Sequence, residues 1–216
     1  MTKAAIAFTI LGMGSLLATI GCAVSAAGAV VPGSGSKVGT NPGNIVKSGA
    51  YHVHATGNNK LASFSAGCFW GTEDIFRQVP GVVATAVGYT GGHLDNPSYE
   101  DVCTHTTGHA ETVLVEFDPS KTSYKKLLAV FWENHDPTTP NQQGPDFGSN
   151  YRSAIWCFDR DQLAQAKQSL ADAQSKLTHK VVTEIQMSQP FWLAEDYHQQ
   201  YDEKHGTHFC PIGHGS

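Results

Sequence analysis

The chain has 216 residues, which predicts one domain, and only 15% of them are charged, fewer than in an average soluble domain. Residues 1–60 carry four lysines and no Asp, Glu or Arg, whereas residues 61–216 have a net charge of −9, which excludes nucleic acid as the main partner because phosphate binding needs clustered Lys and Arg. Five dispersed cysteines exclude a small disulfide scaffold, and their odd number leaves at least one thiol unpaired.

Residues 1–26 have the three parts of a secretory signal. Lys3 precedes an apolar run over 4–20, and small residues continue to Ala26. We expect cleavage after Ala26, and two alternatives remain open. The sequence before Cys22 resembles a bacterial lipoprotein box, which would make Cys22 a lipidated first residue. The run is also marginally long enough to stay as a membrane anchor. Each alternative predicts an exported bacterial protein, periplasmic or tethered on the periplasmic side.

Residues 27–60 predict a flexible linker, because they are rich in Gly, Ser, Pro and Asn and show no apolar period. His52 and His54 fall in this segment. Isolated linker histidines more often have no role than bind a metal, so we expect no site there.

Residues 61–216 predict a single α+β domain. Apolar alternation and short β-rich runs predict strands at 61–66, 82–87, 111–117, 153–158 and 181–186. Helical spacing and capping residues predict helices at 69–78, 124–134 and 160–177. This order predicts a two-layer α/β sandwich with a ferredoxin-like (split βαβ) core, extended loops and a flexible C-terminal tail.

Cys68 lies where the first strand meets the first helix. Free backbone N–H groups and the positive end of the helix dipole should lower the pKa of a thiol there and favour the thiolate. Phe69 and Trp70 follow directly and would form an apolar wall beside the sulfur. A buried structural cysteine beside core aromatics is the alternative, and position alone leaves the two about equally favoured.

Seven segments of residues 61–211 resemble, in the same order, motifs of the A-type peptide methionine sulfoxide reductases. They are GCFWGTE at 67–73, GYTGG at 88–92, PSYEDVC at 97–103, TGHAE at 107–111, FWENHDP at 131–137, DFGSNYRS at 146–153 and AEDYHQQY at 194–201. Each motif alone would be a weak signal, but seven in order are specific.

The resemblance implies a thiol-dependent enzyme that reduces methionine S-sulfoxide, free or in proteins, and so repairs oxidised proteins without a cofactor. Cys68 would attack the sulfoxide and become a sulfenic acid. Glu111 stands where the family has its acid, and partial burial would keep it protonated. Tyr99 and Tyr151 match two tyrosines whose hydroxyls donate to the sulfoxide oxygen.

The resemblance also implies residues that bind the substrate. Phe69 and Trp70 match the apolar cage around the sulfoxide methyl group, and Asp146 matches a carboxylate that fixes the substrate backbone.

Cys210, in the Gly- and His-rich tail, matches the family's resolving cysteine. It would form a disulfide with Cys68, and thioredoxin or a similar dithiol would reduce that disulfide. Cys103 matches a family cysteine regarded as non-essential, and Cys157 lies in a predicted strand. We expect both to be buried bystanders, and the protein to be a monomer.

Three other functions remain open at this point: a cysteine hydrolase, a zinc-binding tail, and a non-enzymatic module that binds sulfoxides and would not need the acid Glu111. A cysteine hydrolase would pair Cys68 with His109 or His198 as its base. The tail could bind zinc through His205, His208, Cys210 and His214, but their spacing does not form a regular tetrahedral pattern, so we predict no metal site.

Overall fold

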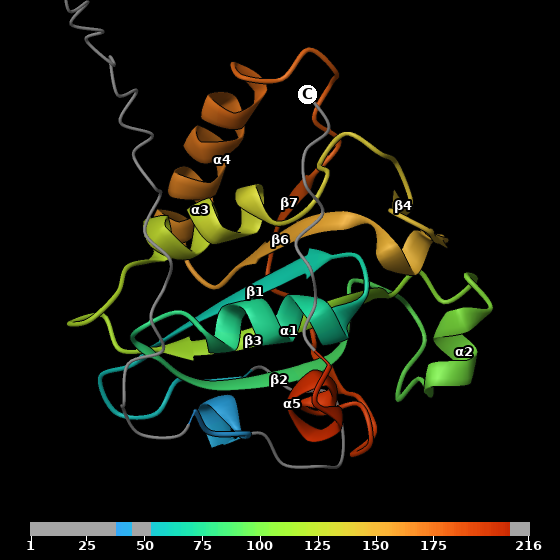
Figure 1. The fold of residues 1–216 in the computed structure, drawn as a ribbon, viewed down its shortest axis with the longest axis horizontal. Helices are drawn as coiled ribbons and strands as arrows, with labels where there is room; N and C mark the ends of the chain where they lie inside the picture. Colours follow the sequence, from blue (N-terminus) through green and yellow to red (C-terminus); the bar gives the residue numbers. More distant parts are fainter. Residues whose placement is uncertain (1–37, 45–52, 208–216) are drawn as a thin grey trace, which may run out of the picture.

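A computed structural model describes residues 38–44 and 53–207 of the chain. Its centre is a six-stranded sheet in the order β7-β6-β1-β3-β2-β8 (Figure 1). Strands β6 and β7 are parallel, and the other neighbouring strands of this sheet are antiparallel. The strands are β1 (Lys60–Ala66), β2 (Val82–Thr90), β3 (Ala110–Phe117), β6 (Ser153–Cys157), β7 (Glu184–Met187) and β8 (Trp192–Leu193).

The main helices pack on one face of this sheet, and α1 and α3 lie along it in Figure 1. Strands β4 and β5 form a separate small hairpin, and 3-10 turns lie at Pro42–Asn44 and Ser149–Tyr151. The helices and the hairpin strands are α1 (Phe69–Arg77), α2 (Tyr99–Cys103), α3 (Tyr124–Glu133), α4 (Arg160–Gln174), α5 (Tyr201–His205), β4 (Gln142–Gln143) and β5 (Asp146–Phe147).

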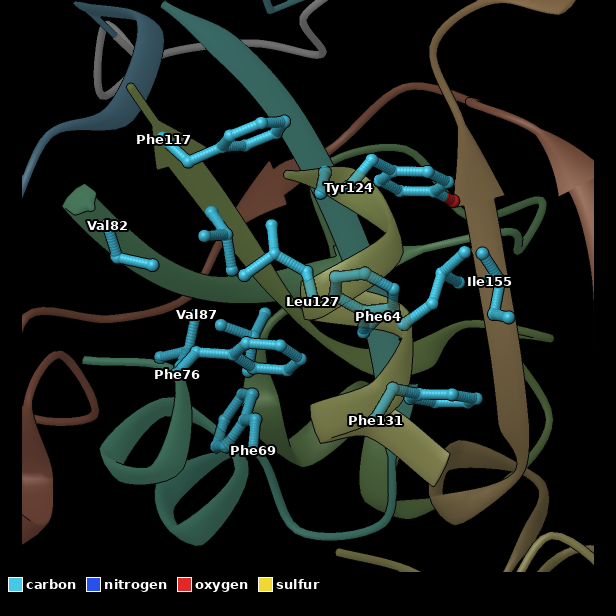
Figure 2. Close-up of a cluster of buried hydrophobic side chains, with 14 of the residues drawn as sticks. Phe64, Phe69, Phe76, Val82, Val87, Phe117, Tyr124, Leu127, Phe131 and Ile155 are labelled. Carbon is cyan, nitrogen blue, oxygen red and sulfur yellow. The ribbon is translucent and has the colours of Figure 1, made fainter. Parts of the chain in front are cut away.

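The core between sheet and helices is aromatic. Phe64 of β1 is fully buried and stacks on Phe76 of α1 and Phe131 of α3, with ring centroids 4.8 Å and 5.4 Å apart (Figure 2). Successive side chains of a strand point to opposite faces of the sheet, and Phe64 points to the face that the helices cover. Its ring therefore contacts both α1 and α3. This packing fixes α1, and therefore its first turn, relative to β1.

All five predicted strands and all three predicted helices are present, which confirms a mixed α/β architecture around a mostly antiparallel sheet. The predicted strand at 181–186 lies instead at Glu184–Met187, and the helix predicted to reach residue 177 ends at Gln174. The sequence did not predict α2, the β4–β5 hairpin, β8 or α5.

Parts of the segment 27–60, for which we predicted a flexible linker, contact the central sheet in the structure. Glu116 of β3 is 2% exposed and accepts hydrogen bonds from the backbone N–H of Gly43 (2.6 Å) and of Thr56 (3.0 Å) and from the side chain of Asn59 (2.8 Å). Gly39 also pairs with Ala84 of β2. A buried carboxylate needs such donors, and these segments supply them.

Several predictions fall outside the described residues. The leader with Cys22 and Ala26, the pair member His52, and the tail from His208 with Cys210 and His214 belong to this group. Within the residues that the structure does describe, no helix has the length and apolar character needed to cross a bilayer.

Candidate active site

Cys68 occupies the turn between β1 and α1 and is the N-cap residue of α1, as predicted. Its side chain is half-buried. The preceding Gly67 has a φ of +89°, and a Cβ there would lie 2.5 Å from Cγ of Gln143. The missing side chain therefore lets the β4–β5 hairpin pack directly over the turn that carries the thiol.

The prediction of a lowered thiol pKa is wrong for this structure. Burial raises the pKa of Cys68 to about 12, and the nearby carboxylates of Glu111 and Asp146 raise it further. The backbone N–H groups of Trp70 and Gly71 act in the opposite direction but do not compensate. In the absence of substrate, the site therefore favours the thiol over the thiolate at neutral pH.

Glu111 lies at the start of β3 and is 2% exposed. Its Oε2 accepts a hydrogen bond of 3.1 Å from the backbone N–H of Phe69, in the first turn of α1. Burial raises the pKa of Glu111 to about 8, and the negative charge of Asp146 adds to this effect. The predicted protonated acid is thus what the surroundings of Glu111 favour at neutral pH.

Asn150, which sequence reasoning missed, contacts the second oxygen of Glu111. Its Nδ2 lies 3.5 Å from Oε1 of Glu111, and its Oδ1 accepts a 2.7 Å hydrogen bond from Nδ1 of His105. The histidine orients the amide so that its donor faces the carboxyl group. The position of Asn150 directly before Tyr151, inside a motif, was the available signal.

Tyr99 and Tyr151 come from different elements and lie near the same carboxyl group. Burial raises the pKa of each hydroxyl, to about 12 for Tyr151, and the charge of Glu111 contributes to both increases. Both hydroxyls therefore stay protonated and able to donate at neutral pH. Tyr99 also interacts with the thiol of Cys103, which is half-buried and not the buried bystander that we predicted. Cys157 is fully buried, as predicted.

The predicted cage residues differ in exposure. Phe69 is buried among core aromatics and contacts the ring of His198 at 5.0 Å, whereas Trp70 is half-buried. The Trp70 indole N–H donates to Nδ1 of His198 at 2.9 Å, and its ring stacks on Tyr201 at 3.8 Å. The indole is thus held on two sides by residues of the last motif.

Glu195 is a second residue that the sequence reasoning missed. Its carboxylate accepts hydrogen bonds from the backbone N–H of Tyr99 (2.8 Å) and from the hydroxyl of Tyr89 (3.0 Å). These bonds join α2 to β2 and fix the helix that presents Tyr99. Glu195 lies within the last motif, but nothing in its spacing indicated this contact.

The structure gives no support to a cysteine hydrolase, because the described contacts of His109 and His198 are made with groups other than the thiol of Cys68. His109 is buried, its Nδ1 accepts from the backbone N–H of Gly92 at 3.2 Å, and its Nε2 lies 2.8 Å from the carbonyl of Leu94. Nδ1 of His198 is occupied by Trp70, and burial lowers the pKa of both imidazoles. The largest effects on the pKa of Cys68 come from burial, from Glu111 and Asp146, and from the backbone N–H groups of Trp70 and Gly71.

A metal site is found nowhere in the described part of the chain, where no three His, Cys, Asp or Glu residues are grouped so as to hold an ion. Of the tail residues considered for zinc, only His205 is described. Its Nδ1 lies 2.8 Å from the carbonyl of Tyr201.

The fold and this site bring the thiol of Cys68, at the start of α1, together with the buried carboxyl group of Glu111. Residues 60–216 match the family model described as peptide methionine sulfoxide reductase. The chain therefore belongs to the peptide methionine sulfoxide reductase family.

Named relatives agree with this assignment. Peptide methionine sulfoxide reductase MsrA of Methanosarcina acetivorans is 58% identical over 147 residues, which cover 67% of this chain and 78% of the relative. Peptide methionine sulfoxide reductase A2 of Arabidopsis thaliana is 52% identical over 150 residues, 69% of each chain. The solved structure of methionine sulfoxide reductase A of Corynebacterium diphtheriae has a TM-score of 0.69 at 33% identity, over 83% of this chain and 92% of that one.

Gly67→Ala should cost about 2–4 kcal/mol of unfolding free energy, because it adds a collision with Gln143 to the strain of a left-handed backbone. Gly57→Ala is the matched control, since its φ is +59° and no atom lies within 4 Å of the added Cβ. We expect the control to lose about 1–2 kcal/mol in urea unfolding, from strain alone. Equal losses in the two variants would show that the hairpin does not press on the Cys68 turn.

Proposed function

We propose that the protein is a peptide-methionine (S)-S-oxide reductase, which reduces methionine S-sulfoxide, free or in proteins, to methionine. The observation that carries the proposal is the pairing of Cys68 with Glu111, a buried carboxyl group with a pKa of about 8. Reduction of a sulfoxide needs a nucleophile for sulfur and a proton for the departing oxygen, and these two groups supply them.

The first step transfers oxygen from the substrate to Cys68. The sulfur of Cys68 forms a bond to the sulfoxide sulfur while Glu111 protonates the sulfoxide oxygen. The thiol proton passes to the carboxylate that Glu111 leaves behind, the oxygen moves to the Cys68 sulfur, and methionine departs. Methionine sulfoxide is reduced by two electrons and Cys68 is oxidised to a sulfenic acid.

The two oxygens of Glu111 are suited to different tasks. Oε2 accepts the backbone N–H of Phe69 at 3.1 Å, so it is held against the helix. Oε1 has only a long contact of 3.5 Å with Asn150 and is therefore the oxygen that we assign to carry the proton. The hydrogen bond to Oε2 thus holds the carboxyl group in place and leaves Oε1 able to donate its proton.

Tyr99 and Tyr151 donate hydrogen bonds to the sulfoxide oxygen in this proposal. Raised pKa values keep both hydroxyls protonated, which supports a donor role. Phe69 and Trp70 bound the site of the substrate methyl group, and Asp146 accepts from the substrate backbone. Burial raises the pKa of Asp146, and its charge acts on both Cys68 and Glu111, which supports this assignment.

Cys210 attacks the sulfenic acid in the second step. A Cys68–Cys210 disulfide forms and water leaves, with no further oxidant needed. Thioredoxin or a similar dithiol then reduces the disulfide and returns the enzyme to its starting state.

The split βαβ core is also part of the proposal. The order β6-β1-β3-β2, with α1 between β1 and β2 and α3 between β3 and β6, supports a ferredoxin-like core extended by β7 and β8. We place the reductase domain at residues 61–216, after a leader over 1–26.

We propose that the protein is exported to the periplasm, where it is free or tethered to the membrane. The signal pattern over residues 1–26 is the basis for this proposal.

Glu111→Gln should slow the first step by about two orders of magnitude, because the amide cannot supply a proton. With Glu111 present, the rate should hold below pH 8 and fall as the pH rises through about 8, where the carboxyl group loses its proton. Single-turnover formation of methionine across pH 6–10 measures both effects, with the exposed Glu133→Gln as control. An unchanged rate and an unchanged pH profile in Glu111→Gln would rule out the acid role.

Cys210→Ser should release one equivalent of methionine per enzyme and then stop when thioredoxin is the reductant, because the sulfenic acid is not resolved. Cys68→Ser is the reference variant and should release none. Quantifying methionine from an S-sulfoxide peptide separates the two. Full thioredoxin-driven turnover by Cys210→Ser contradicts the resolving role, and methionine release by Cys68→Ser contradicts the nucleophile.

The intact mass of the protein from its native host tests the location. Cleavage after Ala26 should leave a chain that starts at Ala27, lipidation should add a diacylglyceryl group to Cys22, and an anchor should leave the full mass. An unprocessed chain in the cytosolic fraction would be incompatible with export.

A further inference from the structure

Gln143 of β4 is 5% exposed, although it lies in the long loop between α3 and β6. Its side-chain amide forms two hydrogen bonds with the backbone of Asp136, shortly after α3. The N–H of Asp136 donates to Oε1 at 3.1 Å, and Nε2 donates to the carbonyl oxygen of Asp136 at 3.1 Å. The amide thus uses both its acceptor and its donor to join the β4–β5 hairpin to the chain after α3.

The segment to which this amide binds is itself fixed in the core. His135 is 1% exposed, its Nδ1 donates to the carbonyl of Phe131 at 2.7 Å, and its Nε2 lies 2.7 Å from the hydroxyl of Ser153 in β6. The carbonyl of Pro137 accepts from the N–H of Val182 at 2.8 Å. These contacts hold the segment to α3, to β6 and to the chain before β7, and all of them are made without the hairpin.

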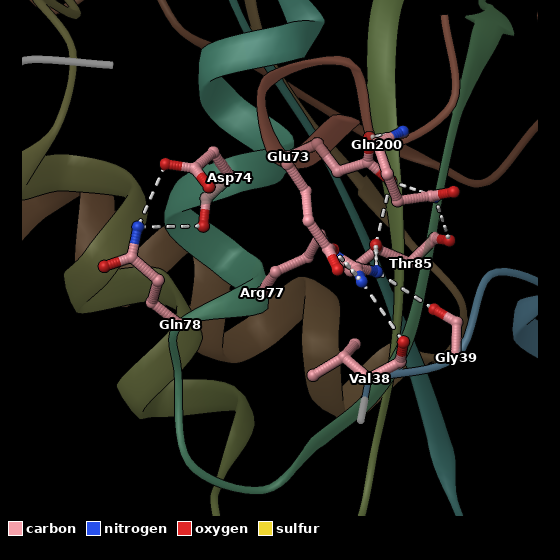
Figure 3. A network of polar contacts seen from close by, with 9 residues as sticks. Val38, Gly39, Glu73, Asp74, Arg77, Gln78, Thr85 and Gln200 are labelled. Atoms are coloured by element: carbon pink, nitrogen blue, oxygen red, sulfur yellow. Dashed lines mark hydrogen bonds and ion pairs between the residues drawn. The ribbon is translucent and has the colours of Figure 1, made fainter. Parts of the chain in front are cut away.

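The turn on the other side of Gln143 is also fixed. A Cβ on Gly67, just before Cys68, would lie 2.5 Å from Cγ of Gln143, so the two pack closely. Helix α1 follows this turn and is bound to β2. Arg77 of α1 donates to the hydroxyl of Thr85 in β2 at 3.0 Å, and this hydroxyl donates to a carboxylate of α1 at 2.8 Å (Figure 3). Gln143 therefore lies between two fixed parts of the molecule.

Asp146 of β5 lies opposite Gln143 across the hairpin, and Gln142 lies opposite Phe147. Opposed residues of an antiparallel pair point to the same face, whereas neighbours along a strand point to opposite faces. Phe147 is 66% exposed, so its pair with Gln142 lies on the outer face. Gln143 and Asp146 therefore share the inner face, from which the charge of Asp146 acts on Cys68.

We propose that Gln143 is a positioning residue for substrate binding, because its two bonds to Asp136 hold the tip of the hairpin and so place the Asp146 carboxylate where it accepts from the substrate backbone. This role rests on the proposed function, in which Asp146 binds the substrate. The bond of 2.9 Å from the N–H of Gly148 to the carbonyl of Asn141 holds the base of the hairpin. It would remain if Gln143 were replaced, but it does not attach the tip to the chain after α3.

The loss of these two bonds should weaken binding and leave the chemical step in place. Glu111 is held by the backbone N–H of Phe69, and Cys68 by α1, so neither reacting group depends on the amide of Gln143. Gln143→Met is the most direct variant, since an unbranched side chain of similar length keeps the packing on Gly67 and loses both hydrogen bonds.

Single-turnover formation of methionine by the full-length chain, followed at increasing concentrations of a methionine S-sulfoxide peptide, gives a half-saturating concentration and a maximal rate. Gln143→Met should raise the half-saturating concentration about three- to tenfold, as expected for lost hydrogen bonds, and keep the maximal rate within about twofold. Gln143→Ala, which also loses the packing on Gly67, should raise the half-saturating concentration at least as much.

A double-mutant cycle with Asp146→Ala separates positioning from a general structural role. In the Asp146→Ala background, Gln143→Met should change the half-saturating concentration by less than about twofold, because the carboxylate that Gln143 places is already absent. Gln142→Ala is the matched control, a glutamine of the same hairpin on its outer face, and it should give the values of the parent chain.

Parent values in Gln143→Met, together with a raised half-saturating concentration in Asp146→Ala, would overturn the positioning role and leave the proposed function intact. An equal rise in the parent and Asp146→Ala backgrounds would also overturn it, because Gln143 would then not act through Asp146. If Asp146→Ala itself binds the peptide like the parent, the substrate contact in the proposed function fails, and the role of Gln143 fails with it.

Discussion

The hydrogen bond from the backbone N–H of Phe69 to Oε2 of Glu111 is the constraint on which the site depends. It joins the first turn of α1 to the start of β3, two segments 42 residues apart in sequence. A helix N-terminus has a small number of free backbone N–H groups, and in α1 the one of Phe69 donates to Glu111. The field of the helix is thereby shared between the carboxyl group and the thiol of Cys68.

This sharing helps to explain why Cys68 is a protonated thiol at neutral pH. At a solvent-exposed helix N-terminus, the helix dipole and water stabilise the thiolate of a cysteine and lower its pKa. Here the hairpin that carries Gln143 and Asp146 covers the turn. Burial and the two carboxyl groups of Glu111 and Asp146 raise the thiol pKa more than the backbone N–H groups of α1 lower it. The site stores its protons on both Cys68 and Glu111, which suits a reaction that must protonate a departing oxygen at the moment when sulfur bonds to sulfur.

Much of this arrangement was predictable, and the part that was not has a common physical cause. Apolar period and caps located the main strands and helices, and the motifs located the site residues, because both are local in sequence. The direction of the Cys68 pKa was missed because it depends on burial by a hairpin some 75 residues away. Strand β8 was missed because its two residues pair only where Gly88 lacks a side chain, and a Cβ there would lie 2.2 Å from the carbonyl oxygen of Trp192.

Buried glutamates connect these non-local parts. Glu73 receives the backbone N–H of Gln200, Glu111 that of Phe69, and Glu116 that of Gly43, so each carboxyl group fixes a remote segment. Burial raises the pKa of Glu73 and of Glu111, so the folded protein binds more protons than the unfolded chain between pH 4.5 and the folded values, about 8 for Glu111. The free energy of unfolding therefore falls as the pH rises through that window. The protein keeps the proton of Glu111 at neutral pH at the expense of stability, and the donors that hold these carboxyl groups limit that loss.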